Sequence, residues 1–247
     1  MQAIILAAGL AKRLRPLTDT TPKCLLDVCG KNLLHRTMEN VIKNGINDFI
    51  FVTGYRENMI KDYLNKNFMD VNMKFLTNTD YSNNNNSYSL WMTKDFVKDG
   101  FILLDSDIVF DSRIIKKLLA DPNENAAAVN TAVKLDDEQI KVTVDSNNRI
   151  LRMAKDVPIH EAIGESIGIE KFSKSLGNEI FKILDRKVLK DNNVNEFYEK
   201  TFEDIIERND PRNSIYSVDV SEYESVEIDT VDDYKKAQNE LKHKHIE

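Results

Sequence analysis

Short apolar runs alternate with amphipathic segments through the first half of the chain. The runs have the length and composition of strands buried on both faces, and they cover residues 3–8, 49–53, 73–77 and 101–104. Between them, apolar residues recur every three or four positions, which predicts helices over 34–42, 57–67 and 87–97. Strands that alternate with helices favour a mostly parallel sheet covered on both faces, in which ligands collect at the carboxyl ends of the strands.

The second half of the chain has a different pattern. Ile140 and Val142 alternate with polar residues ahead of a turn at Asn147 and Asn148, which predicts a β-hairpin. The other predicted elements are a β extension over 164–172, helices over 178–189 and 195–208, a strand near 226–228, and a last helix behind a Thr230–Asp233 capping box. The predicted fold class is α/β: a single domain over 1–247 with a mixed, mainly parallel, Rossmann-like sheet and a β-rich lobe.

Composition and charge limit the classes of partner. Hydrophobic residues make up 41% and charged residues 30% of the chain, the balance of a soluble globular protein. The apolar runs are too short to span a bilayer and no basic segment precedes the first of them, so we expect a cytoplasmic protein with no membrane partner. The net charge of -7 disfavours nucleic acid, whose binding needs a surplus of basic residues. Cys24 and Cys29 are expected to be reduced packing residues, and a homodimer is compatible with this composition.

The first apolar run ends in a loop suited to phosphate. Ala7, Ala8 and Gly9 carry little or no side chain, so their backbone N–H groups can approach a nucleotide closely. Arg13 and Lys23 follow, and substitution on a triphosphate needs positive charge both on the leaving pyrophosphate and on the phosphorus under attack. An ordinary α/β turn with surface charges is the alternative interpretation of the loop alone.

The whole string from Leu6 to Lys23 resembles the signature of the sugar-phosphate nucleotidyltransferase superfamily, L-A-A-G-x-G-x-R-L-x-P-L-T with P-K a few residues on. The resemblance implies attack by a phosphate or phosphonate oxygen on the α-phosphorus of a nucleoside triphosphate. It makes Arg13 and Lys23 catalytic, and it assigns nucleotide binding to the loop residues Leu6, Ala7, Ala8, Gly9 and Ala11. Ala11 replaces the second glycine of the signature, and a methyl group is tolerated there if φ is negative.

Two aspartates follow apolar strands far apart in the chain. The same resemblance makes Asp107 and Asp229 the ligands of Mg²⁺, which needs only one or two carboxylates beside water and substrate phosphates. Without the resemblance, Asp107 could equally belong to a turn and Asp229 to a helix cap. Asp105, at the end of the same strand as Asp107, is assigned to the nucleotide-binding set.

The Asn-rich segment suggests a particular nucleotide. Residues 84–90 resemble the N-N-x-Y-S-L stretch of bacterial phosphocholine cytidylyltransferases, which use CTP, so Asn84 and Ser87 are predicted to bind nucleotide. The alternative is a plain loop in which Ser87 caps a helix.

The acceptor-binding residues are predicted from charge and aromatic character. Lys141 is placed on the face of the hairpin opposite the core, and relatives carry basic residues such as Lys141 and Lys155 in this region to meet an acceptor phosphate. A solvated strand face is the alternative for both lysines. Glu165 belongs to a stretch that approaches the acceptor in relatives. Aromatic rings beside carboxylates would suit a quaternary or primary ammonium group, and such a constellation is formed by Phe197, Tyr198, Glu199, Glu203 and Asp204. From it, Tyr198, Glu203 and Asp204 are assigned to acceptor binding, together with Trp91. Core packing is the alternative for Tyr198, which has Phe202 and Ile206 at helical spacing.

The sequence therefore predicts a Mg²⁺-dependent transferase that moves a cytidylyl group from CTP to a small phosphorylated alcohol, amine or phosphonate. Its nucleotide-binding half is expected over about 1–110 and its acceptor-binding half over about 111–247. One alternative is a hexose-1-phosphate nucleotidyltransferase that uses dTTP, UTP or GTP. A catalytically silent, nucleotide-sensing regulatory subunit is another.

Overall fold

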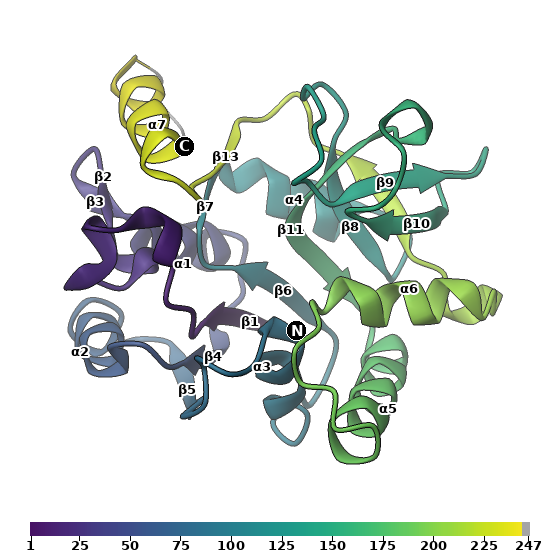
Figure 1. The fold of residues 1–247 in the computed structure, drawn as a ribbon, viewed down its shortest axis with the longest axis horizontal. Helices are drawn as coiled ribbons and strands as arrows, with labels where there is room; N and C mark the ends of the chain where they lie inside the picture. The colour runs from purple at the N-terminus through teal and green to yellow at the C-terminus, as the bar shows by residue number, and fades with distance from the viewer. Residues whose placement is uncertain (244–247) are drawn as a thin grey trace.

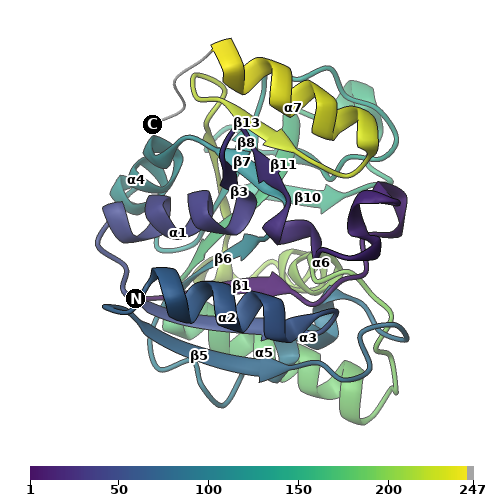
Figure 2. The same cartoon turned by 90° about the vertical axis from the view of Figure 1, so that its left-hand side faces the viewer.

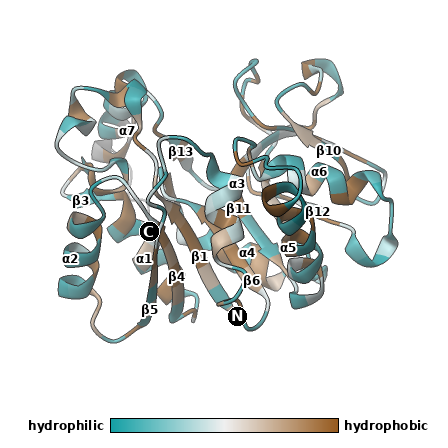
Figure 3. Cartoon of the chain, turned by 60° about the horizontal axis from the view of Figure 1, so that its bottom comes forward, coloured by the Kyte–Doolittle hydropathy of each residue, from teal (hydrophilic) through white to brown (hydrophobic). Residues whose placement is uncertain are grey.

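A nine-stranded mixed sheet forms the centre of the molecule (Figure 1). The computed structural model describes residues 1–243. Four adjacent strands pair in parallel, in the order β6 (Phe101–Asp105), β1 (Gln2–Ala7), β4 (Asp48–Thr53) and β5 (Asn72–Thr77). The apolar strands β1 and β4 are brown in Figure 3, as expected for strands covered on both faces. These four strands confirm the predicted Rossmann-like centre.

The β-rich lobe extends this sheet beyond β6 by antiparallel pairing. The long strand β11 (Gly164–Phe172) pairs antiparallel with β6, and also with β8 (Ala126–Asn130) and β9 (Lys141–Val144). The lobe is completed by β10 (Ile150–Ala154), antiparallel to β9, and β12 (Tyr216–Asp219), parallel to β8. The mixed α/β class is therefore confirmed.

Side-chain alternation along β1 divides the core between the two faces of the sheet. Ile5 packs in a cluster with α1 (Leu33–Lys43), α2 (Glu57–Asn67) and α4 (Ser112–Ala120). Ile4 and Leu6 pack on the opposite face with α3 (Asn86–Met92), α5 (Lys174–Leu189) and α6 (Glu199–Glu207). Because both faces are buried, polar groups of the central strands reach solvent only at the strand ends.

Two small two-stranded sheets lie outside the main sheet. The first pairs β7 (Ile108–Phe110) with β13 (Ser225–Glu227), and the second pairs β2 (Asp27–Val28) with β3 (Lys31–Asn32). The last helix, α7 (Val231–His243), lies at the top of the molecule beside β13, with α5 at the bottom (Figure 2). The short 3₁₀ helices are η1 (Lys12–Leu14), η2 (Leu17–Asp19), η3 (Lys23–Leu25), η4 (Ile159–Glu161) and η5 (Pro211–Asn213).

Helix caps explain most of the boundaries that differ from the predicted ones. The Ser173 side chain accepts a hydrogen bond from the N–H of Leu176, so α5 begins at Lys174 and not near 178. The predicted helix over 87–97 ends at Met92, because the next residues turn with Thr93 Oγ1 donating to the Leu90 carbonyl. The predicted capping box is present: Thr230 N donates to Asp233 Oδ2 at 2.8 Å, and Asp233 N donates to Thr230 Oγ1 at 3.2 Å.

The sequence pattern missed β8 and α4, as well as β12 and the short strands β2, β3 and β7. The strand β8 is built from Ala126, Ala127 and Ala128, which lack the β-branched and aromatic residues typical of strands. The helix α4 follows directly on β7, so its apolar residues merge with those of the strand. Among residues 1–243, the structure contains no helix long and apolar enough to cross a membrane.

Candidate active site

The carboxyl ends of β1 and β6 open into a cavity of about 380 Å³. Parallel pairing places Leu6 opposite Asp105, so the loop after β1 lies beside the segment after β6. Thirteen of the predicted site residues line the cavity: Leu6, Ala7, Ala8, Gly9, Ala11, Arg13, Lys23, Asn84, Asp105, Asp107, Lys155, Glu165 and Asp229. The site thus forms at the sheet edge where parallel folds bind ligands.

The loop after β1 leaves room for a ligand. A methyl group built on Gly9 would meet no atom within 4 Å, because Gly9 faces the open cavity. Ala11 has φ 46° and ψ 53°, so the negative φ at which a methyl group would be tolerated without strain is not adopted. This left-handed conformation costs a non-glycine residue roughly 1–2 kcal/mol. Hydrogen bonds from Thr18 Oγ1 (2.9 Å) and Leu14 N (3.1 Å) to the Ala11 carbonyl fix the turn.

Strand pairing brings Asp229 to Asp107 from the far end of the chain. Residues of β13 pair antiparallel with β7, and Glu227 lies opposite Ile108. One residue on, the N–H of Ile228 donates to the carbonyl of Asp107 at 3.0 Å. The two aspartates therefore share one end of the cavity.

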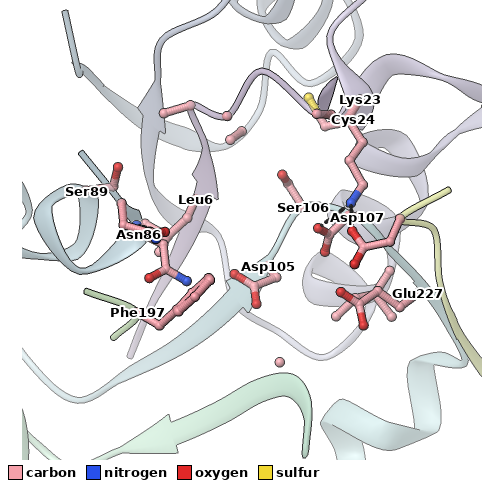
Figure 4. A pocket seen from close by; sticks show the side chains of 18 of the residues that line it. Leu6, Lys23, Cys24, Asn86, Ser89, Asp105, Ser106, Asp107, Phe197 and Glu227 are labelled. Atoms are coloured by element: carbon pink, nitrogen blue, oxygen red, sulfur yellow. Dashed lines mark hydrogen bonds and ion pairs between the residues drawn. The ribbon is translucent and has the colours of Figure 1, made fainter. Parts of the chain in front are cut away.

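Lys23 bridges the two aspartates. Its Nζ lies 2.7 Å from Asp107 Oδ2 and 2.7 Å from Asp229 Oδ1, and Arg13 Nη2 also donates to Asp229 (Figure 4 shows Lys23 and Asp107). Burial alone would lower the pKa of Lys23, but the two carboxylates outweigh it and hold the pKa above its usual value. For Asp229, burial is likewise outweighed by Lys23 and Arg13, which lower its pKa. Both predicted cations thus contact the predicted metal ligands.

A third carboxylate, Glu227, completes this acidic group. Oxygens of Asp107, Glu227 and Asp229 all lie within 4.8 Å of one another. Burial, with the charges of Asp107 and Asp229, raises the pKa of Glu227 to about 8. Sequence reasoning did not select Glu227 as a ligand, although alternation along a strand places positions 227 and 229 on the same side.

The donor set fits a hard divalent cation. It consists of carboxylate oxygens, which Mg²⁺ prefers. Asp107 Oδ1 is also shut off from solvent without a hydrogen-bond partner among residues 1–243, so one ligand atom is free. Asp107, Asp229 and Glu227 are therefore the residues that could hold the metal.

The Asn-rich segment lines the opposite end of the cavity. Asn84 and Asn78 exchange side-chain hydrogen bonds of 2.7 and 3.1 Å, which fixes the orientation of the Asn84 amide. Ser87 was predicted to bind nucleotide, but it is buried within α3 and does not line the cavity. Asn85, and not Ser87, is the helix cap. Asn86 and Ser89 line the cavity instead (Figure 4).

Lys141 is not on an open face, contrary to the prediction. It is 1% exposed, and its Nζ donates to the carbonyls of Asp136 (3.0 Å) and Gln139 (3.3 Å). The reason is that the loop before β9 folds over the strand face, which hydropathy alternation alone cannot reveal. Lys141 therefore holds this loop in place and does not line the cavity.

Four predicted acceptor contacts are also corrected. Trp91 Nε1 donates to Asp185 on α5 at 2.8 Å, and Tyr198 is fully buried with its hydroxyl donating to Asp105 Oδ2 at 2.9 Å. Glu203 pairs with Arg152 and Lys200, and Asp204 pairs with Arg186 and Lys187. None of the four lines the cavity, because each is paired with neighbours on the helices or on strands β6 and β10.

Two neighbours of Tyr198 in the same predicted constellation do line the cavity. Phe197, with 48% of its surface exposed, and Glu199, the first residue of α6, both line the cavity. Lys155 lies next to them, with its Nζ 5.5 Å from the centre of the Phe197 ring and 3.5 Å from Glu138. The sequence signal was an aromatic and an acid flanking a core tyrosine, but the pattern does not tell which neighbours reach the cavity.

Glu165 lies on β11 where this strand pairs with β9. Gln139 Nε2 donates to its Oε2 at 2.9 Å, and burial raises the pKa of Glu165 to about 7. Of the basic and acidic residues predicted for this lobe, Lys155 and Glu165 are thus the two that line the cavity.

The fold and the cavity define a nucleotidyltransferase-type site, and comparison of sequences agrees. The nucleotidyl transferase family matches residues 2–154, and the chain belongs to this family. The chain is 32% identical to CTP:phosphoglutamine cytidylyltransferase of Campylobacter jejuni, over 82% of this chain and 86% of that protein. It is 27% identical to choline-phosphate cytidylyltransferase of Streptococcus pneumoniae, over 98% of this chain and 99% of that protein. The predicted resemblance to the bacterial phosphocholine cytidylyltransferases is confirmed.

Solved structures show the same fold. CTP:phosphocholine cytidylyltransferase from Streptococcus pneumoniae superposes with a TM-score of 0.76 at 23% identity, covering 97% of this chain and 98% of that chain. Inositol-1-phosphate CTP transferase from T. maritima gives a TM-score of 0.78 at 22% identity, covering 98% of this chain and 96% of that chain.

Proposed function

We propose that this protein transfers a cytidylyl group from CTP to a small phosphorylated alcohol, amine or phosphonate and releases pyrophosphate. The observation that carries the proposal is Lys23, which bridges Asp107 and Asp229 beside the loop after β1. The names of the cytidylyltransferase relatives from Campylobacter jejuni and Streptococcus pneumoniae support the choice of CTP.

Positioning and charge supply most of the catalysis in this proposal. The acceptor phosphate is already anionic near neutral pH, so it attacks the α-phosphorus without a general base. Lys23 neutralises charge at the phosphorus under attack. Arg13, which is more exposed, neutralises charge on the leaving pyrophosphate.

Asp107 and Asp229, with Glu227 beside them, would hold Mg²⁺. The bound ion supplies positive charge to the phosphate oxygens. The carboxylates raise the pKa of Lys23, which keeps it charged, and their hydrogen bonds to its Nζ hold it in place at the cavity.

A pyrophosphate-release assay tests the proposal. CTP, UTP, dTTP and GTP are each supplied with a panel of phosphorylated amines, alcohols, phosphonates and hexoses. Turnover with CTP and a small non-sugar acceptor is the expected result. Turnover mainly with dTTP, UTP or GTP and a hexose 1-phosphate would overturn the proposal. If no combination of nucleotide and acceptor releases pyrophosphate, a nucleotide-sensing role is favoured.

A further inference from the structure

Glu199 is a carboxylate in the cavity that has no side-chain hydrogen-bond or ion-pair partner among the described residues. It is the first residue of α6, is 9% exposed and lines the cavity. Its Oε2 is shut off from solvent and accepts no hydrogen bond within residues 1–243. An unpaired buried charge costs several kcal/mol in an apolar surrounding, so a group of this kind normally has a donor.

Apart from Glu227 of the acidic group, the other acids of the cavity have side-chain donors in the described part of the chain, and Glu199 has none. Asp107 and Asp229 contact Lys23, and Glu165 accepts from Gln139. Lys155 is the cation that acts electrostatically on Glu199, but it forms its ion pair with Glu138. Glu199 is thus the cavity acid best placed to accept hydrogen bonds from a ligand.

Negative charge accumulates around Glu199. The partly exposed Asp105 and the buried Glu170 lie beside it, and Oε2 of Glu170 is also without a partner among the described residues. Burial and the neighbouring acids raise the pKa of both Asp105 and Glu170, as expected where cations are too few. A cationic ligand group would relieve this imbalance.

The surrounding aromatic side chains favour an ammonium that carries N–H bonds. A quaternary ammonium has no N–H and is usually held by several aromatic faces. In the described part of the chain, the cavity has only Tyr81 and Phe197 as aromatic lining residues, since Trp91 and Tyr198 bond elsewhere. Lys155 already lies over the Phe197 ring.

Glu199 lies away from Lys23 and hence from the nucleotide phosphates, but at the end of the cavity that the Asn-rich segment also lines. The KM for CTP therefore separates a contact with the acceptor from one with the base. In Figure 4, Phe197 lies at one end of the pocket, Lys23 and Asp107 lie at the other, and Asp105 lies between them. Glu199 acts electrostatically on Asp105 and follows Phe197 by two residues. A small acceptor with its phosphate toward Lys23 could thus direct its other end toward Glu199.

We infer that Glu199 accepts hydrogen bonds from an N–H-bearing ammonium of the acceptor, so that the preferred acceptors are phosphates or phosphonates of primary amines and not of quaternary amines or alcohols. This inference rests on the proposed function and names its acceptor class. The competing role for Glu199 is purely structural, because an acid in the first turn of a helix is stabilised by the helix dipole.

Three matched acceptors test the inference: 2-aminoethyl phosphate, phosphocholine and 2-hydroxyethyl phosphate. With CTP, we expect kcat/KM for 2-aminoethyl phosphate to exceed both others by at least about tenfold, the effect of one charge-assisted hydrogen bond. Glu199→Gln should raise KM for 2-aminoethyl phosphate by about tenfold to a hundredfold and change KM for CTP by less than about twofold.

Glu203→Gln is the matched control. It changes the same residue type one helical turn later, but Glu203 pairs with Arg152 and Lys200 and does not line the cavity. Its KM for 2-aminoethyl phosphate should stay within about twofold of the unaltered protein, and thermal melting of both variants reports folding. If Glu199→Gln lowers only the melting temperature and leaves the acceptor ranking unchanged, the role is structural and the inference is wrong.

The outcomes separate this inference from the proposed function. Turnover of phosphocholine or 2-hydroxyethyl phosphate at least as efficient as that of 2-aminoethyl phosphate overturns the inference but leaves the function intact. If pyrophosphate is not released from CTP with any of the three acceptors, the proposed function fails for them. The inference is then decided by calorimetry, which measures the binding of each acceptor to the unaltered protein and to Glu199→Gln. Binding of 2-aminoethyl phosphate that is about tenfold tighter than the others and lost in Glu199→Gln supports it; any other binding result overturns it.

Discussion

Lys23 Nζ lies 2.7 Å from Asp107 Oδ2, although 84 positions separate the two residues in the chain. The contact joins the loop after β1 to the end of β6, which are parallel neighbours in the sheet. Asp229 binds the same Nζ through the pairing of β13 with β7. Three distant segments therefore meet at one cation, and the fold is organised to bring them there.

Removing either aspartate charge should remove most of the activity and little of the stability. We expect Asp107→Asn and Asp229→Asn each to lower kcat by about a hundredfold or more, because each loses a charged metal ligand and a partner of Lys23. Melting temperatures should change little, since both side chains lie at a cavity edge. Asp156→Asn is the control, because Asp156 is exposed and pairs only with Arg152 in the described chain. Near-normal kcat and magnesium dependence in either site variant would contradict the metal assignment.

Arg13 should act mainly on kcat. Charge grows on the leaving pyrophosphate in the transition state, so Arg13→Ala is expected to lower kcat by about a hundredfold with a smaller change in KM for CTP. Arg15→Ala is a close control, because Arg15 pairs with Asp19 and does not line the cavity. Steady-state kinetics of both variants make the comparison. A rise in KM for CTP at unchanged kcat would instead make Arg13 a plain binding residue.

The sequence predicted the parallel half of the fold well because its signals are local. Each apolar run, such as the one ending at Leu104, gives the strand directly, and the loop after Ala7 has the small residues that the site needs. The position of Asp229 is different, because it depends on pairing between β13 and β7 across most of the chain. Only the family resemblance indicated that contact in advance.

The acceptor residues were harder to predict, because hydrophobic periodicity shows which face of a helix or strand a side chain lies on but not which other segment packs over that face. Glu199 and Glu203 occupy positions four apart on the same helix, so they point in similar directions. Their positions along the helix axis differ by one turn. Glu199, at the start of α6, reaches the cavity, whereas Glu203 pairs with Arg152 of β10. Lys141 shows the same limit, since a loop covers the strand face that alternation left open.

The Asn-rich segment should control the choice of nucleotide. We expect kcat/KM for CTP to exceed that for UTP by at least about tenfold, because the wrong base leaves buried polar groups without partners. Asn84→Ala should reduce this ratio, since Asn84 lines the cavity with its amide fixed by Asn78. Asn83→Ala should leave it unchanged, because Asn83 is an exposed neighbour bonded to Asp80. Equal rates with CTP and UTP in the unaltered protein would exclude a base-reading role for this segment.

Glu199 should make the stability of the ligand-free protein depend on pH. Burial raises its pKa from the ordinary 4.5 to about 7, so between these pH values the folded state holds a proton that the unfolded state releases. The stability linked to this proton is fully present below about pH 4.5 and is lost as the pH rises to about 7. Glu199→Gln cannot lose that proton, so its melting temperature relative to the unaltered protein should be higher at pH 8 than at pH 5, with a free-energy difference of at most roughly 3 kcal/mol. Thermal melts of both proteins across this range make the measurement, with Glu203→Gln as the reference for an acid paired to Arg152. A difference between Glu199→Gln and the unaltered protein that does not vary with pH would mean that Glu199 is ionised throughout, and hence that a cation already neutralises it.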